Sequence, residues 1–362
     1  MRNKFLDFTI GITLCISIAL CGQYLSKYFG TKILQFDKSP ISPIFIAIVI
    51  GCFLGNTSRI GDMCNLGISF CIKYILKFGI ILMGIRLGLN EIIAFGVKGL
   101  LVVTPCILLT LLLVEKSRVY FRLSSNLATL IAVGTSICGA TAIVATAPAI
   151  NARKEEIAYA IANISIFGIF AMVIYPFAAH YFFPTNPVFA GLFLGSSIHE
   201  TGQVAGAGMI YSDQYLSPKV FDVSTITKLV RNTAMIIVIP YLSFKYTRRV
   251  GTKNSIGKRL YQNFPFFIFG FLFFGLLRTF GDYSLENSKR VFGLLNPDLW
   301  SWLVLKINMF SKFFLTIAMS AIGISTDLKK LKLIGAHVFY YGFVIALFVG
   351  VISLISIKLL FG

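Results

Sequence analysis

Residues 134–141 read GTSICGAT and lie in the middle of an apolar segment that runs from Leu127 to Ile150. Two glycines and three hydroxyl side chains weaken a helix at this point, and Pro148 follows. An interrupted helix at membrane depth is tolerated only where it lines a cavity or is buried in protein. The stretch therefore predicts a broken membrane helix with backbone groups free for binding; close helix packing by small residues is the alternative.

The composition of the whole chain is that of a membrane protein. Hydrophobic residues make up 57% and charged residues 13% of its 362 residues, and the mean hydropathy is +0.83. Soluble domains carry about 25% charged residues. The net charge of +19 is typical of Lys- and Arg-rich cytoplasmic loops. No basic stripe is interleaved with stacking aromatic residues, so we expect no nucleic-acid partner.

The apolar segments set the fold class. A bilayer core requires about 20 apolar residues per helix, and no polar connection is long enough for a separate soluble domain. We predict an all-α polytopic membrane protein with about 11 transmembrane helices. The segments are 8–25, 41–55, 67–89, 99–114, 127–150, 157–177, 188–211, 225–244, 264–277, 299–326 and 335–360.

The basic residues predict the orientation. Cytoplasmic loops are enriched in Lys and Arg, and the loop after the eighth segment carries the densest group: Lys245, Arg248, Arg249, Lys253, Lys258 and Arg259. With this loop inside, the N-terminus is cytoplasmic and the C-terminus lies on the periplasmic or extracellular side.

A weak internal similarity indicates duplication. Pro43-Ile-Phe45 before Gly51 resembles Pro187-Val-Phe189 before Gly195, five helices later. An odd offset inverts the second repeat, which is a common transporter architecture. We predict an extra N-terminal helix and loop at 1–40, and inverted five-helix repeats at 41–180 and 181–362. A second similarity, between GTSIC at 134–138 and GSSIH at 195–199, lies only two helices apart and does not fit this offset.

Polar residues inside apolar segments are functional candidates, because burying them in a bilayer is costly. His199, Glu200 and Gln203 form one such group. His199 and Gln203 share a helix face, and His199 could carry a coupling proton near neutral pH. A structural hydrogen-bond network is the alternative, and Glu200 could pair with a nearby base.

Cations within the spans form another group, since Lys228 and Arg231 are three residues apart and Arg86 lies near a segment end. Guanidinium groups suit oxyanions; snorkelling to the interface or a buried ion pair is the alternative. Ser325, Thr326 and Asp327 close the tenth segment, five helices after the GTSICGAT stretch. This spacing predicts that the fifth and tenth segments are both broken and cross near the midplane, although Asp327 with Lys329 and Lys330 could simply mark the helix end.

Signatures of covalent chemistry are missing. There is no HExxH, P-loop or GxGxxG pattern, and the seven cysteines, an odd number, form no CxxC pair. We expect no metal, no cofactor and no enzymatic activity. An intramembrane hydrolase using Ser136 and His199 is a remaining alternative, as is an anion channel.

Five stretches of the chain resemble the YeiH-like sulfate exporter family of bacterial inner-membrane proteins. They are LKFGIILMGIRLGL at 76–89, GTSICGA at 134–140, GSSIHE with Gln203 at 195–203, KLVR at 228–231 and AMSAIGISTDL at 318–328. After His199 the family has an acid followed by Val-Ala, whereas this chain has Glu200-Thr201-Gly202. After Arg231 the family is apolar, whereas Asn232 and Thr233 follow here. Both departures make the expected cavity more polar.

The resemblance implies a ten-helix inverted-repeat core plus one extra helix, similar to bile-acid:sodium symporters, with crossed broken helices. It also implies transport of a small anion such as sulfate or a sulfonate. We therefore expect a secondary active exporter of a small anion; an ion-coupled importer of organic anions is the alternative. Expected partners are the bilayer, the anion and a coupling H⁺ or Na⁺, with a homodimer through Gly51 and Gly55 left open. The expected substrate-binding residues are Arg86, Ser136, Ile137, Cys138, Gly139, Thr141, His199, Glu200, Gln203, Lys228, Arg231, Ser325 and Thr326.

Overall fold

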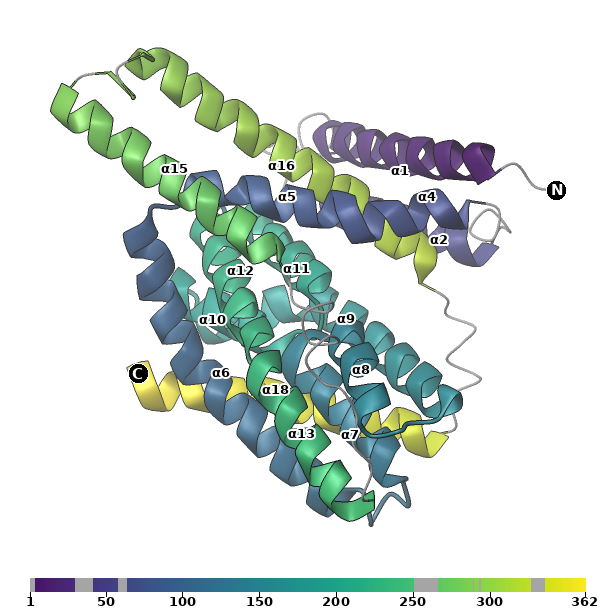
Figure 1. The fold of residues 1–362 in the computed structure, drawn as a ribbon. Helices are drawn as coiled ribbons and strands as arrows, with labels where there is room; N and C mark the ends of the chain where they lie inside the picture. Colours follow the sequence, from purple (N-terminus) through teal and green to yellow (C-terminus); the bar gives the residue numbers. More distant parts are fainter. Residues whose placement is uncertain are drawn as a thin grey trace. The chain divides into compact units, whose positions relative to one another are not determined.

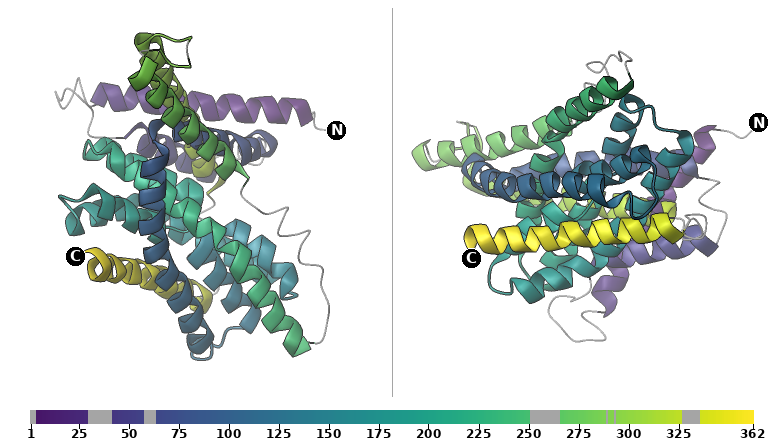
Figure 2. Two further views of the ribbon diagram at one scale, coloured as in Figure 1. Left: turned by 60° about the vertical axis from the view of Figure 1, so that its left-hand side comes forward. Right: turned by 90° about the horizontal axis from the view of Figure 1, so that it is seen from below.

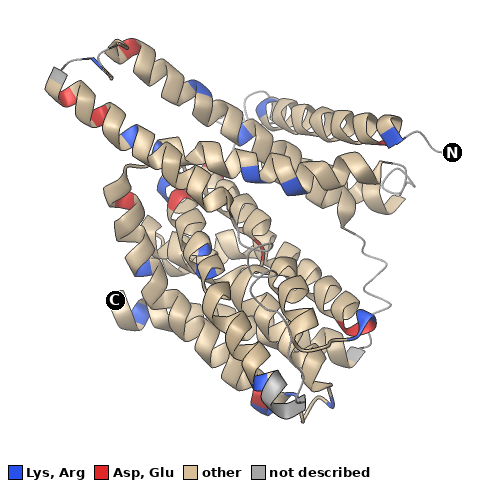
Figure 3. Ribbon diagram, in the orientation of Figure 1, with Lys and Arg blue, Asp and Glu red and all other residues tan. Residues whose placement is uncertain are grey.

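The computed structural model of the chain describes residues 4–29, 42–57, 64–250, 266–288, 290–292, 294–326 and 336–362. These residues form helices and contain no strand; a single bridge joins Val291 and Leu295. Basic and acidic residues are sparse along most of the helices (Figure 3). Within the described residues, eight helical segments are long and apolar enough to cross a membrane, and four shorter apolar helices accompany them. The prediction of an all-α polytopic membrane protein is confirmed.

Each predicted segment coincides with a helix or with a run of consecutive helices. The first four correspond to α1 (Lys4–Lys27), α2 (Pro43–Thr57), the run α4–η2–α5–η3 (Asn65–Arg86) and α6 (Leu89–Ser117). The number of membrane spans stays a prediction. Lys253, Lys258 and Arg259 of the orientation signal, and Asp327, Lys329 and Lys330, lie outside the described residues.

The chain divides into two compact units, and each gathers helices from both halves of the sequence (Figure 1). Unit 1 comprises Met1–Ala94, Asp213–Leu216 and Phe266–Asp327. In it, α16 (Pro297–Ser325) packs against α1, α2 and α5, while α15 (Phe267–Ser288) packs against α5. Its core contains Cys15, Ala47 and Ile317.

The contact between α2 and α16 depends on glycine. A Cβ on Gly51 would lie 2.5 Å from the carbonyl oxygen of Ser320, and one on Gly323 would lie 2.5 Å from that of Ile48. Gly55 faces the carbonyl of Ile324 in the same way. The two helix backbones therefore approach closely, as small residues allow in membranes. The Gly51–Gly55 face that we considered for a homodimer packs within the chain, and the homodimer itself stays a prediction.

Unit 2 comprises Phe95–Ser212, Ser217–Pro265 and Leu328–Gly362. It contains most of α6 and the following helices: α7 (Ser125–Val133), η4 (Gly134–Cys138), α8 (Ala140–Thr146), η5 (Ala147–Ala149), α9 (Lys154–Phe182), α10 (Pro187–Ser197), α11 (Thr201–Gln214), α12 (Pro218–Thr233), α13 (Met235–Val250) and α18 (Ala336–Phe361). The C-terminal α18, yellow in Figure 2, packs against α9 and α10. Leu130, Ile164 and Tyr341 belong to the core of this unit.

Helix α12 lies against α10 through two glycines one turn apart. A Cβ on Gly191 would lie 2.6 Å from Cβ of Val223, and one on Gly195 would lie 2.5 Å from the carbonyl oxygen of Ser224. Any larger residue at either position would force the helices apart. This close packing brings the buried face of α12 to the C-terminal end of α10, where the candidate site lies.

Candidate functional site

Unit 2 contains two helices that stop and restart within an apolar segment. The first break follows α7, which begins at the N-cap residue Ser124, whose hydroxyl accepts the N–H of Leu127 at 3.2 Å. The helix continues as the π-helical turn η4 and ends at Cys138. Gly139 then adopts φ +71° and ψ −134°, a region that essentially only glycine occupies, and α8 begins at Ala140. The predicted break in the fifth segment is therefore present at Gly139.

The second break lies in the seventh segment. Helix α10 starts at Pro187, where the side chain of Asn186 accepts the N–H groups of Val188 and Phe189. It ends at Ser197, and Ile198 is extended, with φ −82° and ψ 144°. Helix α11 restarts at Thr201.

The start of α11 is held by Gln203. Its Oε1 accepts the backbone N–H of Glu200 at 3.1 Å, which is the reciprocal half of a capping box. Gly168 on α9 leaves room for this side chain, because a Cβ there would lie 2.0 Å from the same Oε1. Gln203 is 1% exposed, so it is the buried polar group that the sequence predicted. Its role here is to accept a backbone N–H at the break.

Arg231 joins the two breaks. It is fully buried on α12, and its Nε donates to the carbonyl of Ser136 at 2.6 Å. Nη1 donates to the carbonyls of Ser196 at 2.7 Å and Ile198 at 2.8 Å, and Nη2 donates to the carbonyl of Thr135. The guanidinium therefore binds the end of η4 and the end of α10 together.

Lys228 lies one turn earlier on the same buried face of α12 and is also fully buried. Its ammonium donates to the carbonyls of Ile137 at 2.9 Å, of Ile198 at 3.0 Å and of His199. An ammonium group has three N–H donors, so all three are used.

These hydrogen bonds explain how two helix ends are tolerated in an apolar interior. The last four carbonyls of a helix have no partner within the helix, and they carry a partial negative charge of about half an electron. Cations at a helix C-terminus satisfy both requirements. Lys228 and Arg231 are fully buried, so neither side chain snorkels to the interface. Their hydrogen-bond partners are carbonyl oxygens, where the other alternative, a buried ion pair, needs a carboxylate.

Glu200 supplies negative charge beside the first break. Its Oε1 accepts the N–H of Ala140 at 3.2 Å, and a Cβ on Gly139 would lie 2.3 Å from its Cγ. Two cations and one carboxylate lie at these breaks. If all three are ionised, the two breaks together carry excess positive charge.

Several buried polar atoms at the breaks have no hydrogen-bond partner in the described residues: Ser136 Oγ, His199 Nδ1 and Asn232 Oδ1. Each residue is at most 2% exposed. Buried polar groups in native proteins are normally satisfied by protein or by ordered water. The guanidinium of Arg231 also has five N–H donors, and its hydrogen bonds to backbone carbonyls use four of them. Donors and acceptors for a small polar guest are therefore present at the breaks.

Asn232 was not among the expected binding residues, and its hydrogen bond explains why it is polar. Its Nδ2 donates to Oγ1 of Thr201 at 3.1 Å, which links α12 to the start of α11. The sequence did contain a signal for this contact. Thr201 and Asn232 are both polar at positions where the resembled family has apolar residues. The structure brings those two departures together.

The chain matches the family described as Conserved hypothetical protein 698 over residues 10–342. A UPF0324 membrane protein of Streptococcus agalactiae is 33% identical over 321 residues, which cover 89% of this chain and 88% of the relative. The chain belongs to the UPF0324 family of membrane proteins. UPF0324 proteins of Fusobacterium nucleatum and Streptococcus pyogenes are 32% and 33% identical, each over 95% of this chain and over 94% and 95% of the relative. No solved structure matches the chain. The family resemblance drawn from the sequence motifs is confirmed.

In this UPF0324 protein, ten of the thirteen expected site residues lie in unit 2. Lys228, Arg231, Glu200 and Gln203 contact the breaks directly, as described, and the carbonyls of Ser136, Ile137 and His199 are bound by the cations. The side chains of Ile137 and Cys138 instead belong to an apolar cluster with α13, where Cys138 Sγ lies 3.3 Å from Sδ of Met235. Thr141 is exposed.

The other three expected residues, Arg86, Ser325 and Thr326, lie in unit 1. Arg86 ends the 3-10 turn η3 and is partly exposed. The hydroxyls of Ser325 and Thr326 donate to the carbonyl of Ile322 in their own helix at 2.9 and 2.7 Å. Their assignment to the substrate site stays a prediction.

The expected break within the tenth segment is not observed, because α16 is one continuous helix from Pro297 to Ser325. Its middle lacks the glycine and hydroxyl density of residues 134–141, and Gly323 lies near its end. The broken partner of the fifth segment is the seventh. The similarity between GTSIC and GSSIH, which did not fit an offset of five helices, thus has a structural explanation: both motifs end a half-helix whose carbonyls bind Lys228 and Arg231.

Proposed function

We propose that this protein is a secondary active transporter of a small anion, such as sulfate or a sulfonate, in the bacterial inner membrane. The anion binds at the breaks of α7–α8 and α10–α11 and crosses by alternating access. The N-terminus is cytoplasmic and the C-terminus lies on the opposite side, as the loop charges predict.

The observation that carries the proposal is the charge of the breaks. Lys228 and Arg231 are fully buried, and Glu200 is the carboxylate hydrogen-bonded at the first break. Charge that is buried in a medium of low dielectric constant attracts a counter-ion strongly. An anion is therefore the guest that the breaks favour, and Na⁺ or a neutral solute is disfavoured as the primary guest.

The polar atoms without partners support a small oxyanion. The hydroxyl of Ser136 can donate a hydrogen bond, and the guanidinium of Arg231 has one further N–H. Nδ1 of His199 donates or accepts according to its tautomer. A protonated His199 or Glu200 would accompany the anion in proton-coupled transport, and its titration would set the pH dependence.

The way the breaks are held supports alternating access. The cations clamp the first half of each broken helix, while α8 and α11 are attached through Gly139 and through the extended residues after Ser197. Rotation about these short connections changes which side of the breaks is open. The carboxylate of Glu200, which accepts the N–H of Ala140 at the start of α8, is released from that N–H when an anion takes its place.

The test is counterflow of radiolabelled sulfate and of a short alkyl sulfonate in proteoliposomes. We expect saturable exchange, with the anion affinity about tenfold lower in Ser136→Ala, because a hydrogen bond to a charged group contributes roughly 1.5–3 kcal/mol. Ser197→Ala is the matched control, since its hydroxyl is also buried at a break but donates to the carbonyl of Phe193 at 2.5 Å. Equal exchange in both variants contradicts the proposed site.

Other functions give other outcomes in the same preparation. Voltage-driven single-channel currents would indicate an anion channel, and net accumulation down an imposed Na⁺ or H⁺ gradient would indicate an importer. Labelling of Ser136 by a serine-reactive probe, together with the absence of exchange, would indicate a hydrolase.

A further inference from the structure

A cavity of unit 2 lies among α6, α7 and α13 and has a volume of about 450 Å³. All its lining residues belong to unit 2. Ligand pockets in proteins span about 300–1,000 Å³, so this cavity is large enough for a small molecule or for part of a lipid. None of the expected site residues lines it.

The cavity is apolar along most of its length. Leu108 and Leu112 of α6 face Ile237 and Leu242 of α13 across it. Leu108, Leu112 and Ile237 are 55%, 57% and 75% exposed, so they also contribute to the outer surface of the unit. Because that surface lies within apolar helices predicted to span the bilayer, the cavity is accessible to a hydrocarbon chain from the side.

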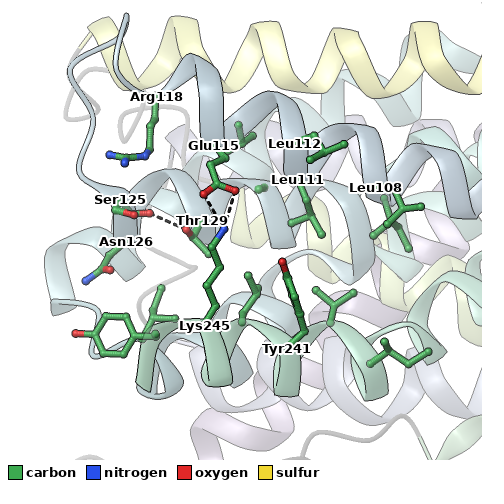
Figure 4. A pocket seen from close by; sticks show the side chains of 18 residues that line it. Leu108, Leu111, Leu112, Glu115, Arg118, Ser125, Asn126, Thr129, Tyr241 and Lys245 are labelled. Atoms are coloured by element: carbon green, nitrogen blue, oxygen red, sulfur yellow. Dashed lines mark hydrogen bonds and ion pairs between the residues drawn. The ribbon is translucent and has the colours of Figure 1, made fainter. Parts of the chain in front are cut away.

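One end of the cavity is charged (Figure 4). The carboxylate of Glu115 accepts from Lys245 Nζ at 2.6 and 2.7 Å. Arg118, which directly follows the last residue of α6, lines the same end, and it has no side-chain hydrogen bond or ion pair within the described part of the chain. Among the described residues that line the cavity, Lys245 neutralises Glu115, so Arg118 contributes one excess positive charge.

The leucines extend away from that charged end along α6 (Figure 4). The charged end is formed by the C-terminal end of α6, the start of α7 and the last part of α13. Lys245, in the last part of α13, belongs to the group of basic residues that predicts a cytoplasmic location. The cavity thus has the layout of an amphiphile: one charged end at the interface and an apolar channel that runs into the bilayer.

We propose that this cavity binds a membrane amphiphile with a single anionic headgroup, whose headgroup lies between Arg118 and Lys245 and whose acyl chain lies along Leu108, Leu112 and Ile237. Basic pockets between membrane helices on the cytoplasmic side suit anionic lipids. An anionic phospholipid and a fatty acid share this chemistry. The proposal is independent of the transport function.

Native mass spectrometry of the full chain, released from detergent with equimolar phosphatidylglycerol, phosphatidylcholine and oleate, tests it. We expect one anionic amphiphile to be retained in preference to phosphatidylcholine. Arg118→Gln weakens its retention about fivefold, while Arg122→Gln, which removes an exposed arginine outside the cavity, leaves retention unchanged. Glu115→Gln strengthens retention of the anionic amphiphile, because Lys245 and Arg118 are then no longer offset by a carboxylate.

Preferred retention of phosphatidylglycerol identifies the phospholipid as the source, and preferred retention of oleate identifies the fatty acid. Equal retention of phosphatidylcholine, or retention that is the same in Arg118→Gln and Arg122→Gln, overturns the proposal. Thermal stabilisation by the retained amphiphile, measured with the same variants in detergent, provides a second readout that keeps a poorly folded variant from being mistaken for loss of binding.

Discussion

Arg231 donates a hydrogen bond from Nε to the carbonyl oxygen of Ser136 at 2.6 Å, across 95 residues of sequence. The same guanidinium binds the carbonyl of Ser196 at 2.7 Å. One side chain therefore fastens the C-terminal ends of two half-helices from different segments. Most of the donors of Arg231 are committed to the backbone.

Replacement of Arg231 by Met is expected to destabilise the protein by about 3–5 kcal/mol, because four buried carbonyls each lose a hydrogen bond. Arg231→Lys keeps the charge but cannot reproduce the planar fork, so its loss is intermediate. Thermal unfolding in detergent measures both. Arg122→Met, at an exposed position, is the control, and an equal loss of stability in the two Met variants would refute the clamp.

Gly139→Ala is expected to cost at least about 2 kcal/mol of stability. A non-glycine residue held in a sparsely populated backbone conformation costs roughly 1–3 kcal/mol, and the new Cβ would lie 2.3 Å from Cγ of Glu200. Gly88→Ala is the matched control, because its nearest neighbour is Thr279 Oγ1 at 3.7 Å. In a Glu200→Ala background, the steric part of the loss at residue 139 should disappear and the backbone part should remain.

Asn232 and Thr201 are expected to be energetically coupled, since Asn232 Nδ2 donates to Thr201 Oγ1 at 3.1 Å. A double-mutant cycle with Asn232→Ala and Thr201→Val should give a coupling free energy of about 0.5–1.5 kcal/mol. Strict additivity of the two single variants would show that the hydrogen bond contributes nothing to stability.

Gly51→Leu is expected to disrupt folding of unit 1, because even a Cβ at this position would lie 2.5 Å from the carbonyl oxygen of Ser320. Phe53→Ala changes the same helix at a residue that is 66% exposed and should alter stability by no more than about 0.5 kcal/mol. Size-exclusion chromatography with light scattering distinguishes the alternatives. A folded Gly51→Leu protein with a changed oligomeric state would mean that this face mediates self-association instead.

Local features of the sequence predicted the helices well. Residues 134–141 predicted a break, and the break is at Gly139, because a glycine that is flanked by helix-weakening residues acts through its own backbone. Residues 195–203 were selected for their polar side chains, and the similarity between GSSIH and GTSIC was visible. The structural reason for this similarity could not be predicted, because the sequence does not show which helix ends meet.

The sequence by itself determined that the chain is a polytopic helical membrane protein, where its apolar segments lie, and which polar residues lie within them. These properties depend on hydropathy and on the conformational preferences of neighbouring residues, which act over a few turns of helix. Only the tertiary structure decided that the fifth segment pairs with the seventh, and that Lys228 and Arg231 bind carbonyls 91 and 96 residues away. Those contacts depend on α12 packing closely against Gly191 and Gly195 of α10, and such long-range packing is a property of the folded chain.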